Sequence, residues 1–299
     1  MIDSDKTRHS SESDFWPAPA KLNLFLHVVG RRPDGYHLLQ TVFQFLDYYD
    51  ELHFSVRQDN TITLAGNYDS IEQEQDLITR AARILQYHCG VDYGVDIIVN
   101  KRLPLGGGLG GGSSDAATTL VALNCLWDLN LDCDKLSKLG LALGADVPVF
   151  VHGKAAWAEG VGEHLTPLEL QEDCFLVVSP GISVSTAEVF NSPDLTRNTP
   201  AITIRDFLAG AGHNDCQEVV RTSYPEVSNL LNWLEKKGPA RMTGTGACVF
   251  CVFPSVEQAN TVLGELPDRW HGFVAKGLNR SPLLQRLELE TQNRVSLSS

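Results

Sequence analysis

The sequence contains one stretch that limits the fold more than any other, Pro104-Leu105-Gly106-Gly107-Gly108-Leu109-Gly110-Gly111-Gly112-Ser113-Ser114. It follows an apolar strand pattern over residues 95–104, and apolar residues then recur at helical spacing from Ala116 to Trp127. Glycine costs backbone entropy, so six glycines within residues 106–112 need a physical reason. A flexible linker joins domains rather than adjacent core elements, so the position of this stretch argues against a linker.

An anion-binding role explains the glycines better. Without Cβ atoms, successive N–H groups can turn toward a phosphate, and the helix that starts near Ser113 and Ser114 adds the positive end of its dipole. The Ser114 hydroxyl is also a candidate metal contact. The lysine of a Walker A loop is absent. Residues 106–111 do fit G-x-G-x-x-G, which keeps a dinucleotide-binding oxidoreductase as an alternative, although no apolar strand ending in an acidic residue follows the helix.

Composition limits the partners and the compartment. The 299 residues include 24 Lys+Arg and 37 Asp+Glu, a net charge of -13, which argues against binding nucleic acid or an anionic membrane. The sequence has no apolar run of membrane-spanning length. The polar N-terminus and seven scattered cysteines predict reduced thiols in the cytoplasm. Cys248 and Cys251 form C-x-x-C within a strand pattern, and we interpret them as buried strand cysteines.

The order of strand and helix patterns predicts an α+β protein of two domains. Strand patterns over residues 21–30 and 41–56 precede a helical pattern over 76–86, and a second mixed unit begins near Cys174. Strict alternation of strands and helices is missing, which argues against a doubly wound sheet. The expected boundaries are a mobile tail at 1–14, domains at 15–168 and 169–284, and a C-terminal tail at 285–299.

Three motifs resemble, in order and spacing, those of the GHMP kinases, a superfamily of small-molecule kinases. They are PAKLNL at residues 19–24, the glycine stretch with the alanines that follow it, and RMTGTGA at residues 241–247. The segment RPDGYH at residues 32–37 narrows the resemblance to a branch that phosphorylates a hydroxyl of a cytidine diphosphate derivative in isoprenoid biosynthesis. Another member, such as a homoserine kinase, is the alternative within the superfamily.

The resemblance implies a ribosomal-S5-like N-terminal domain, a ferredoxin-like C-terminal domain, and an active site in the cleft between them. It also implies ATP and Mg²⁺, a small-molecule substrate, and catalytic roles for Lys21 and Asp146. On the residues alone, Asp146 reads equally well as a helix-capping or turn aspartate or as the base that accepts the hydroxyl proton, and Lys21 could be an edge-strand lysine.

The remaining roles also come from the resemblance. Asn23 would bind the hydroxyls of the substrate, Tyr36 and Phe190 would stack on the two faces of the cytosine ring, and His37 would bind the edge of the base. Thr186 is a weaker substrate contact, and Gly244, Thr245 and Gly246 would bring N–H groups near the diphosphate. The ATP-binding residues would be Pro104, Leu105, Gly106, Gly107, Gly108, Leu109, Gly110, Gly111, Gly112, Ser113 and Ser114. Asp76 and Asp115 depart from the family, which usually has asparagine at both positions.

Overall fold

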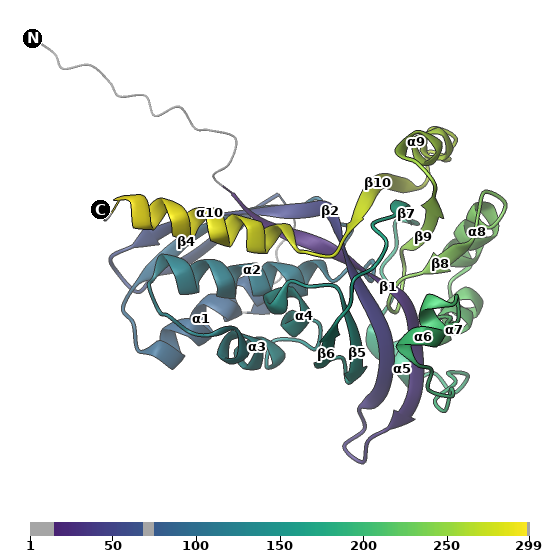
Figure 1. Cartoon of the computed structure of the whole chain (residues 1–299), viewed down its shortest axis with the longest axis horizontal. Coiled ribbons are helices and arrows are strands. Elements are labelled where there is room, and N and C mark those ends of the chain that lie inside the picture. The colour runs from purple at the N-terminus through teal and green to yellow at the C-terminus, as the bar shows by residue number, and fades with distance from the viewer. Residues whose placement is uncertain (1–14, 68–74, 298–299) are drawn as a thin grey trace, which may run out of the picture.

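The computed structural model describes residues 15–67 and 75–297, in which strands and helices mix along the chain (Figure 1). The tail expected at residues 1–14 lies outside the described residues. The strands are β1 Trp16–Arg31, β2 His37–Arg57, β3 Ile62–Gly66, β4 Gly94–Asn100, β5 Ala156–Gly160, β6 His164–Pro167, β7 Cys174–Ser179, β8 Ala240–Met242, β9 Val249–Phe253 and β10 His271–Leu278. The helices are α1 Leu77–Cys89, α2 Gly111–Leu126, α3 Cys133–Leu141, α4 Val147–His152, α5 Thr186–Asn191, α6 Ile204–Leu208, α7 Asp215–Ser223, α8 Pro225–Leu234, α9 Val256–Gly264 and α10 Pro282–Leu297.

The strands form a continuous sheet in the order β3-β4-β2-β10-β7-β9-β8, and β1 and β5 also pair with β2. β3 and β4 are parallel, whereas β1 and β2 form a long antiparallel hairpin. The first strand after α2 is β5, which pairs antiparallel with β2. A dinucleotide-binding fold would place a parallel strand there, so the topology does not support the oxidoreductase alternative.

Two large hydrophobic cores lie along this sheet, one toward each end of the molecule. Figure 1 shows α1–α4 and α10 gathered at one end and α5–α9 at the other. Ala18 of β1 packs into the first core, and Val28, farther along the same strand, packs into the second. The strand predicted over residues 21–30 is therefore part of a longer strand that serves both cores. Asn23 is buried like its apolar neighbours because both faces of the strand are covered.

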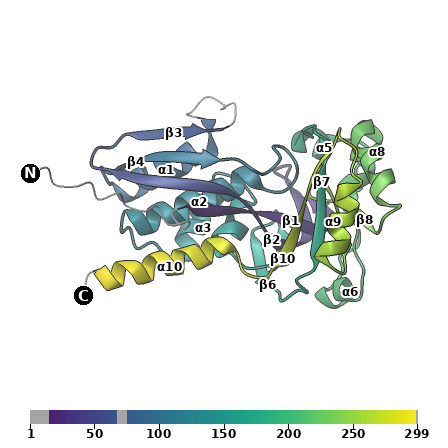
Figure 2. The same cartoon turned by 90° about the horizontal axis from the view of Figure 1, so that it is seen from above.

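Residues 285–297, expected to be part of a tail, belong to helix α10. Figure 2 shows α10 running along the same end of the molecule as α2 and α3. Leu283 is fully buried in the first core, and Leu287, one helical turn later, packs against that core. Arg286 lies over the ring of Trp16, 4.8 Å from its centroid. The prediction of a C-terminal tail is wrong for these residues because their partners come from the opposite end of the sequence.

The cysteines of the C-x-x-C pair lie on opposite sides of the sheet. Cys248 packs into a cluster with Phe175 and Phe250, whereas Cys251 packs into the second core. Both are free and buried, and burial raises the pKa of Cys248 to about 12 and that of Cys251 to about 11. The interpretation as a buried strand cysteine is confirmed for Cys251, whereas Cys248 is buried but lies one residue before β9.

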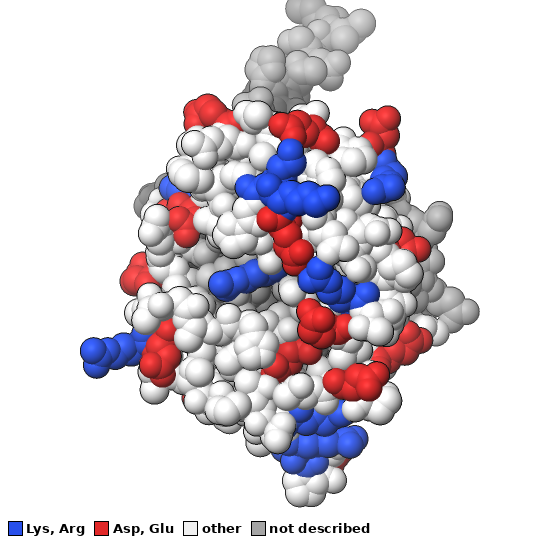
Figure 3. All heavy atoms as spheres, turned by 90° about the vertical axis from the view of Figure 1, so that its right-hand side faces the viewer, with Lys and Arg blue, Asp and Glu red and all other residues white. Residues whose placement is uncertain are grey.

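The charged side chains show no sign of a polyanion-binding face where the surface can be seen. On the face in Figure 3, acidic and basic residues are interspersed, and no continuous basic area forms. Within residues 15–67 and 75–297, no helix combines the length and apolar character needed to cross a bilayer.

Candidate active site

A cavity of about 770 Å³ opens beside the segment that connects β4 to α2. We call residues 104–110 of this segment the glycine loop, and residues 243–248 between β8 and β9 the β8–β9 turn. Both border the cavity, together with parts of β1, β2 and α5. The lining includes every predicted site residue except Ser114, namely Lys21, Asn23, Tyr36, His37, residues 104–113, Asp146, Thr186, Phe190, Gly244, Thr245 and Gly246.

Lys21 is a buried cation that holds the glycine loop against β1. Its side chain is 3% exposed, and its Nζ donates to the carbonyl of Gly108 at 3.1 Å and to Oδ1 of Asn23. Its backbone N–H donates to the carbonyl of Leu109 at 2.9 Å. An edge-strand lysine would reach into solvent, so that alternative is wrong. The ammonium is placed where it can face an anion held by the loop.

Asp146 is the ion-pair partner of Lys21. The two groups lie 3.3 Å apart, and the Asp146 side chain is 35% exposed. Asp146 occupies the N-cap position of α4, but its side chain makes no capping hydrogen bond. The helix-cap alternative is therefore wrong for this carboxylate. It lines the cavity and is available to accept a proton there.

The glycine loop is packed tightly against the β8–β9 turn. The N–H groups of Ala247 and Cys248 donate to the carbonyls of Gly106 and Gly107, at 3.2 and 3.0 Å. Gly108 has φ +75°, and a Cβ at this position would lie 2.3 Å from the carbonyl oxygen of Thr243. Part of the need for glycine is therefore the close approach of two backbones, in addition to any bound anion.

The open end of α2 faces the cavity. The helix begins at Gly111 without a side-chain cap, and the hydrogen bond from the N–H of Ser114 to the carbonyl of Gly110 closes its first turn at 2.8 Å. The preceding N–H groups have no acceptor within the helix and carry the positive end of its dipole. Ser113 lines the cavity, but Ser114 is fully buried behind it. The hydroxyl of Ser114 has no hydrogen-bond partner in the described part of the chain.

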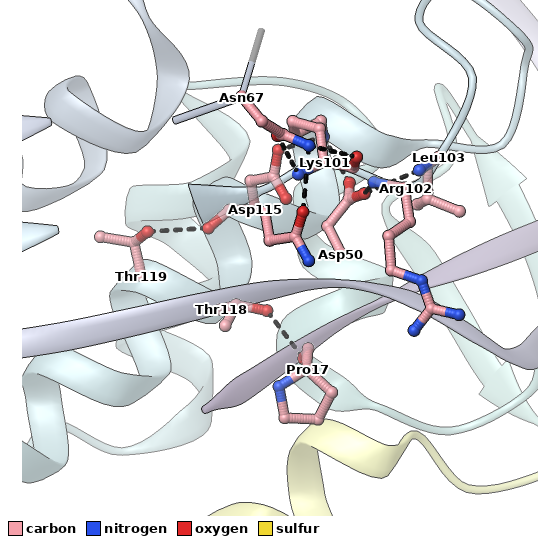
Figure 4. A network of polar contacts seen from close by, with 10 residues as sticks. Pro17, Asp50, Asn67, Lys101, Arg102, Leu103, Asp115, Thr118 and Thr119 are labelled. Carbon is pink, nitrogen blue, oxygen red and sulfur yellow. Dashed lines mark hydrogen bonds and ion pairs between the residues drawn. The ribbon is translucent and has the colours of Figure 1, made fainter. Parts of the chain in front are cut away.

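A buried charged network that the sequence did not reveal lies behind this helix end (Figure 4). Lys101 forms ion pairs with Asp50 and with Asp115, the latter at 2.6 Å. Asp50 also accepts the backbone N–H groups of Arg102 and Leu103, at 2.5 and 2.7 Å. The network thus joins β2, the residues that follow β4 and the second turn of α2. It fixes the two ends of the glycine loop relative to each other.

Asp115 gives this network a pH dependence that can be measured. Burial raises the pKa of Asp115 to about 7, whereas an unfolded chain has an aspartate pKa of about 3.9. Between these values the folded protein binds more protons than the unfolded chain, so its stability falls as pH rises, by at most about 1.4 kcal/mol per pH unit. The loss levels off above the folded pKa.

We therefore expect the free energy of unfolding of the natural protein to fall relative to that of Asp115→Asn as pH rises from about 5 to about 7. Urea unfolding in half-unit pH steps measures this difference. Asparagine keeps the size of the side chain but does not titrate in this range, so it isolates the carboxyl group. Parallel pH profiles for the two proteins would show that Asp115 is not the group that titrates.

The aromatic residues predicted to bind a base lie together at another part of the cavity. The rings of His37 and Phe190 are stacked, with centroids 5.0 Å apart and an angle of 21° between their planes. Tyr36 is 64% exposed and lines the cavity. Thr186 and Thr245 share a hydrogen bond of 2.9 Å between their hydroxyls. The side chains assigned to the substrate therefore border the same cavity as the Lys21–Asp146 pair.

Not all of the backbone N–H groups of the β8–β9 turn predicted to face the diphosphate are free to donate. The N–H of Gly246 donates to the carbonyl of Thr243 at 3.0 Å, and that of Ala247 is taken by the glycine loop. In the described structure, the N–H groups of Gly244 and Thr245 remain available. Asn214 supports the turn by donating to the carbonyl of Gly244 at 2.8 Å. Gly246 therefore lines the cavity while its N–H is engaged within the turn.

Other supporting residues appear only in the structure. Asn23 donates to the hydroxyl of Thr41 at 2.9 Å and accepts from Lys21, so its amide is already oriented before any ligand binds. Asp76, where the family usually has asparagine, caps α1 by accepting the N–H of Ile78 at 2.8 Å. Asparagine caps a helix equally well, so this contact gives Asp76 a structural role without accounting for the departure from the family.

A glycine loop at an open helix end, next to the Lys21–Asp146 pair, suits a small-molecule kinase of the GHMP class, and family models show this class. The model "GHMP kinases N terminal domain" matches residues 76–154, and "GHMP kinases C terminal" matches residues 198–272. The chain belongs to the 4-diphosphocytidyl-2-C-methyl-D-erythritol kinase family of GHMP kinases.

The relatives cover nearly the whole chain. It is 59% identical over 272 residues to the 4-diphosphocytidyl-2-C-methyl-D-erythritol kinase of Ectopseudomonas mendocina, covering 91% of this chain and 94% of the relative. The kinase of Shewanella denitrificans is 56% identical over 276 residues, covering 92% and 97%. A crystal structure of 4-(cytidine 5'-diphospho)-2C-methyl-D-erythritol kinase has a TM-score of 0.77 and 31% identity, covering 88% of this chain and 98% of that one. A mevalonate kinase at 16% identity, with a TM-score of 0.66, shares the fold.

Proposed function

We propose that this chain transfers the γ-phosphoryl group of ATP to the 2-hydroxyl of 4-diphosphocytidyl-2-C-methyl-D-erythritol in the non-mevalonate isoprenoid pathway. The observation that carries the proposal is one cavity that holds three elements. These are the Lys21–Asp146 pair, the open end of α2 and the His37–Phe190 stack. The first two suit phosphoryl transfer, and the third suits recognition of a nucleobase.

Asp146 acts as the base in this mechanism. The hydroxyl oxygen attacks the γ-phosphorus while its proton passes to the carboxylate, the bond between the γ-phosphorus and the bridging oxygen breaks, and ADP leaves. Lys21 pairs with Asp146 at 3.3 Å and offsets negative charge on the reacting oxygens. The N–H groups at the start of α2 bind the phosphates, where the positive end of the helix dipole favours them.

Mg²⁺ would accompany ATP and neutralise charge on its phosphates. Among the described residues, no group of three or more acidic, histidine or cysteine side chains could hold a metal ion. This agrees with the usual habit of Mg²⁺, which keeps several waters and takes phosphate oxygens and few protein ligands. The predicted protein oxygen is the unpartnered hydroxyl of Ser114, which is buried behind Ser113 and does not line the cavity in this structure.

We also propose the expected division into a ribosomal-S5-like domain at residues 15–168 and a ferredoxin-like domain at residues 169–284, with the cavity as the cleft between them. Most of the first core comes from residues 16–158 and most of the second from residues 174–270, which supports this division, while Leu283 packs into the first core and Leu26 and Val28 into the second. The proposed compartment is the cytoplasm, supported by the free state of all seven cysteines.

A coupled ADP-release assay with ATP, Mg²⁺ and 4-diphosphocytidyl-2-C-methyl-D-erythritol tests the function. We expect ADP to form at a rate that depends on the cytidine substrate, and mass spectrometry of the product to show one added phosphoryl group. Homoserine and mevalonate serve as comparison acceptors. Turnover with either of these, and none with the cytidine substrate, would contradict the proposed substrate while preserving the kinase class.

A further inference from the structure

Arg197 lies behind the stacked rings of His37 and Phe190, in the irregular segment between α5 and α6. Its Nε donates to Nε2 of His37 at 3.1 Å. Its Nη2 donates to the carbonyls of Phe190 and Ser192 at 2.8 and 2.6 Å, and its Nη1 donates to the carbonyl of Leu195 at 3.0 Å. One half-buried guanidinium therefore contacts both members of the stack.

The contact with His37 determines which ring nitrogen carries the proton. A guanidinium can only donate, so Nε2 of His37 must offer its lone pair. The neutral ring then carries its proton on Nδ1. Burial lowers the pKa of His37, and the nearby cations Arg197 and Arg31 lower it further, so the ring stays neutral at physiological pH.

Since Nε2 is occupied by Arg197, Nδ1 is the ring nitrogen left for a ligand. We propose that Arg197 is a positioning residue that fixes His37 as the neutral Nδ1–H tautomer, so that this ring offers one hydrogen-bond donor to an acceptor atom of the pyrimidine base. In cytosine the acceptors on the base edge are O2 and N3. This proposal rests on the proposed function, because it takes the base to bind at the His37–Phe190 stack.

The second contact gives Arg197 a further effect on the same site. By binding the carbonyl of Phe190, Arg197 fixes the end of α5, while its bond to His37 fixes the start of β2. Lysine has one compact ammonium and cannot reproduce the planar set of donors. We therefore expect lysine at this position to restore only part of the function.

Nitrogen-15 NMR of the histidine rings tests the tautomer in the free, full-length protein. The His37 signals are assigned by comparison with His37→Gln. We expect the natural protein to show the Nδ1–H tautomer and to resist protonation below the ordinary histidine pKa. In Arg197→Gln, we expect the Nε2–H tautomer to gain population and the pKa of His37 to rise. Arg205→Gln, which removes an exposed arginine in α6, is the matched control and should leave the His37 signals unchanged.

Steady-state kinetics tests the consequence for the substrate. We expect Arg197→Gln to raise KM for the cytidine substrate about tenfold, which corresponds to about 1.4 kcal/mol, with little change in kcat or in KM for ATP. In Arg197→Lys, KM for the cytidine substrate should lie between the values of the natural protein and of Arg197→Gln. An Nε2–H tautomer in the natural protein overturns the proposal, whatever the kinetics show. The expected tautomer with an unchanged KM overturns it as well.

The tautomer measurement also separates this proposal from the proposed function. It needs no substrate, so it can be read even if no cytidine compound is turned over. Titration with cytidine diphosphate in the same spectra then shows whether a cytosine base reaches His37. If the tautomer is as expected but cytidine diphosphate leaves the His37 signals unchanged, the base does not bind here, and both the positioning role and the substrate assignment fail.

Discussion

Asp146→Asn is expected to lower kcat by about 100-fold or more, because asparagine cannot accept the proton of the attacking hydroxyl. Asparagine has nearly the same size as aspartate, and the Asp146 side chain makes no capping hydrogen bond that the fold would lose. KM for both substrates should therefore change by less than about threefold. Steady-state measurement of ADP release gives both constants.

The exposed Asp92 provides a matched control, since Asp92→Asn makes the same chemical change away from the cavity. It should leave kcat unchanged. Thermal unfolding of both variants shows whether each protein is folded. If folded Asp146→Asn keeps the natural kcat, another group takes the proton, and Asp146 only places the ammonium of Lys21, 3.3 Å away.

Gly108→Ala should damage both stability and nucleotide binding. Gly108 has φ +75°, and a Cβ there would lie 2.3 Å from the carbonyl oxygen of Thr243 and 2.9 Å from that of Gly246. These are backbone atoms, so the β8–β9 turn must shift to make room. We expect the free energy of unfolding to fall by about 3 kcal/mol or more. KM for ATP should rise more than about tenfold, since a misplaced loop aims its N–H groups poorly.

Gly264→Ala is the matched control for this second prediction. Gly264 lies at the end of α9, and no atom comes within 4 Å of a Cβ built there. The free energy of unfolding of Gly264→Ala should differ from that of the natural protein by less than about 1 kcal/mol. Urea unfolding and the ATP dependence of ADP release measure the two effects. Natural stability and ATP affinity in Gly108→Ala would show that the loop and the turn can separate at little cost.

Local chemistry accounts for how several elements begin. Ser255 starts α9 by accepting the N–H of Gln258 with its side chain. Pro225 separates α7 from α8 and becomes the first residue of α8, where its missing N–H does no harm. Such features depend on neighbours within a few residues, so a sequence can reveal them.

Features that depend on distant parts of the chain could not be predicted in this way. α10 is held by a contact with Trp16, almost the full length of the sequence away, and by packing into the first core. Lys101, Asp50 and Asp115 come from separate elements, and no spacing rule relates them. Nothing in the sequence near Arg197 indicates its contact with His37, which is 160 residues earlier in the chain. The roles of Lys21 and Asp146 came from family resemblance, because their pairing crosses from β1 to the start of α4.

The backbone bonds between the glycine loop and the β8–β9 turn have a consequence for which molecules can react. These bonds connect the glycine loop, proposed to bind the nucleotide, to the β8–β9 turn, proposed to bind the diphosphate of the acceptor. The distance between the two ligands is then set when the chain folds, before either ligand arrives. The length of the acceptor must therefore match this fixed spacing. A compound with the correct base but a longer or shorter arm would bind and still hold its hydroxyl away from the γ-phosphorus.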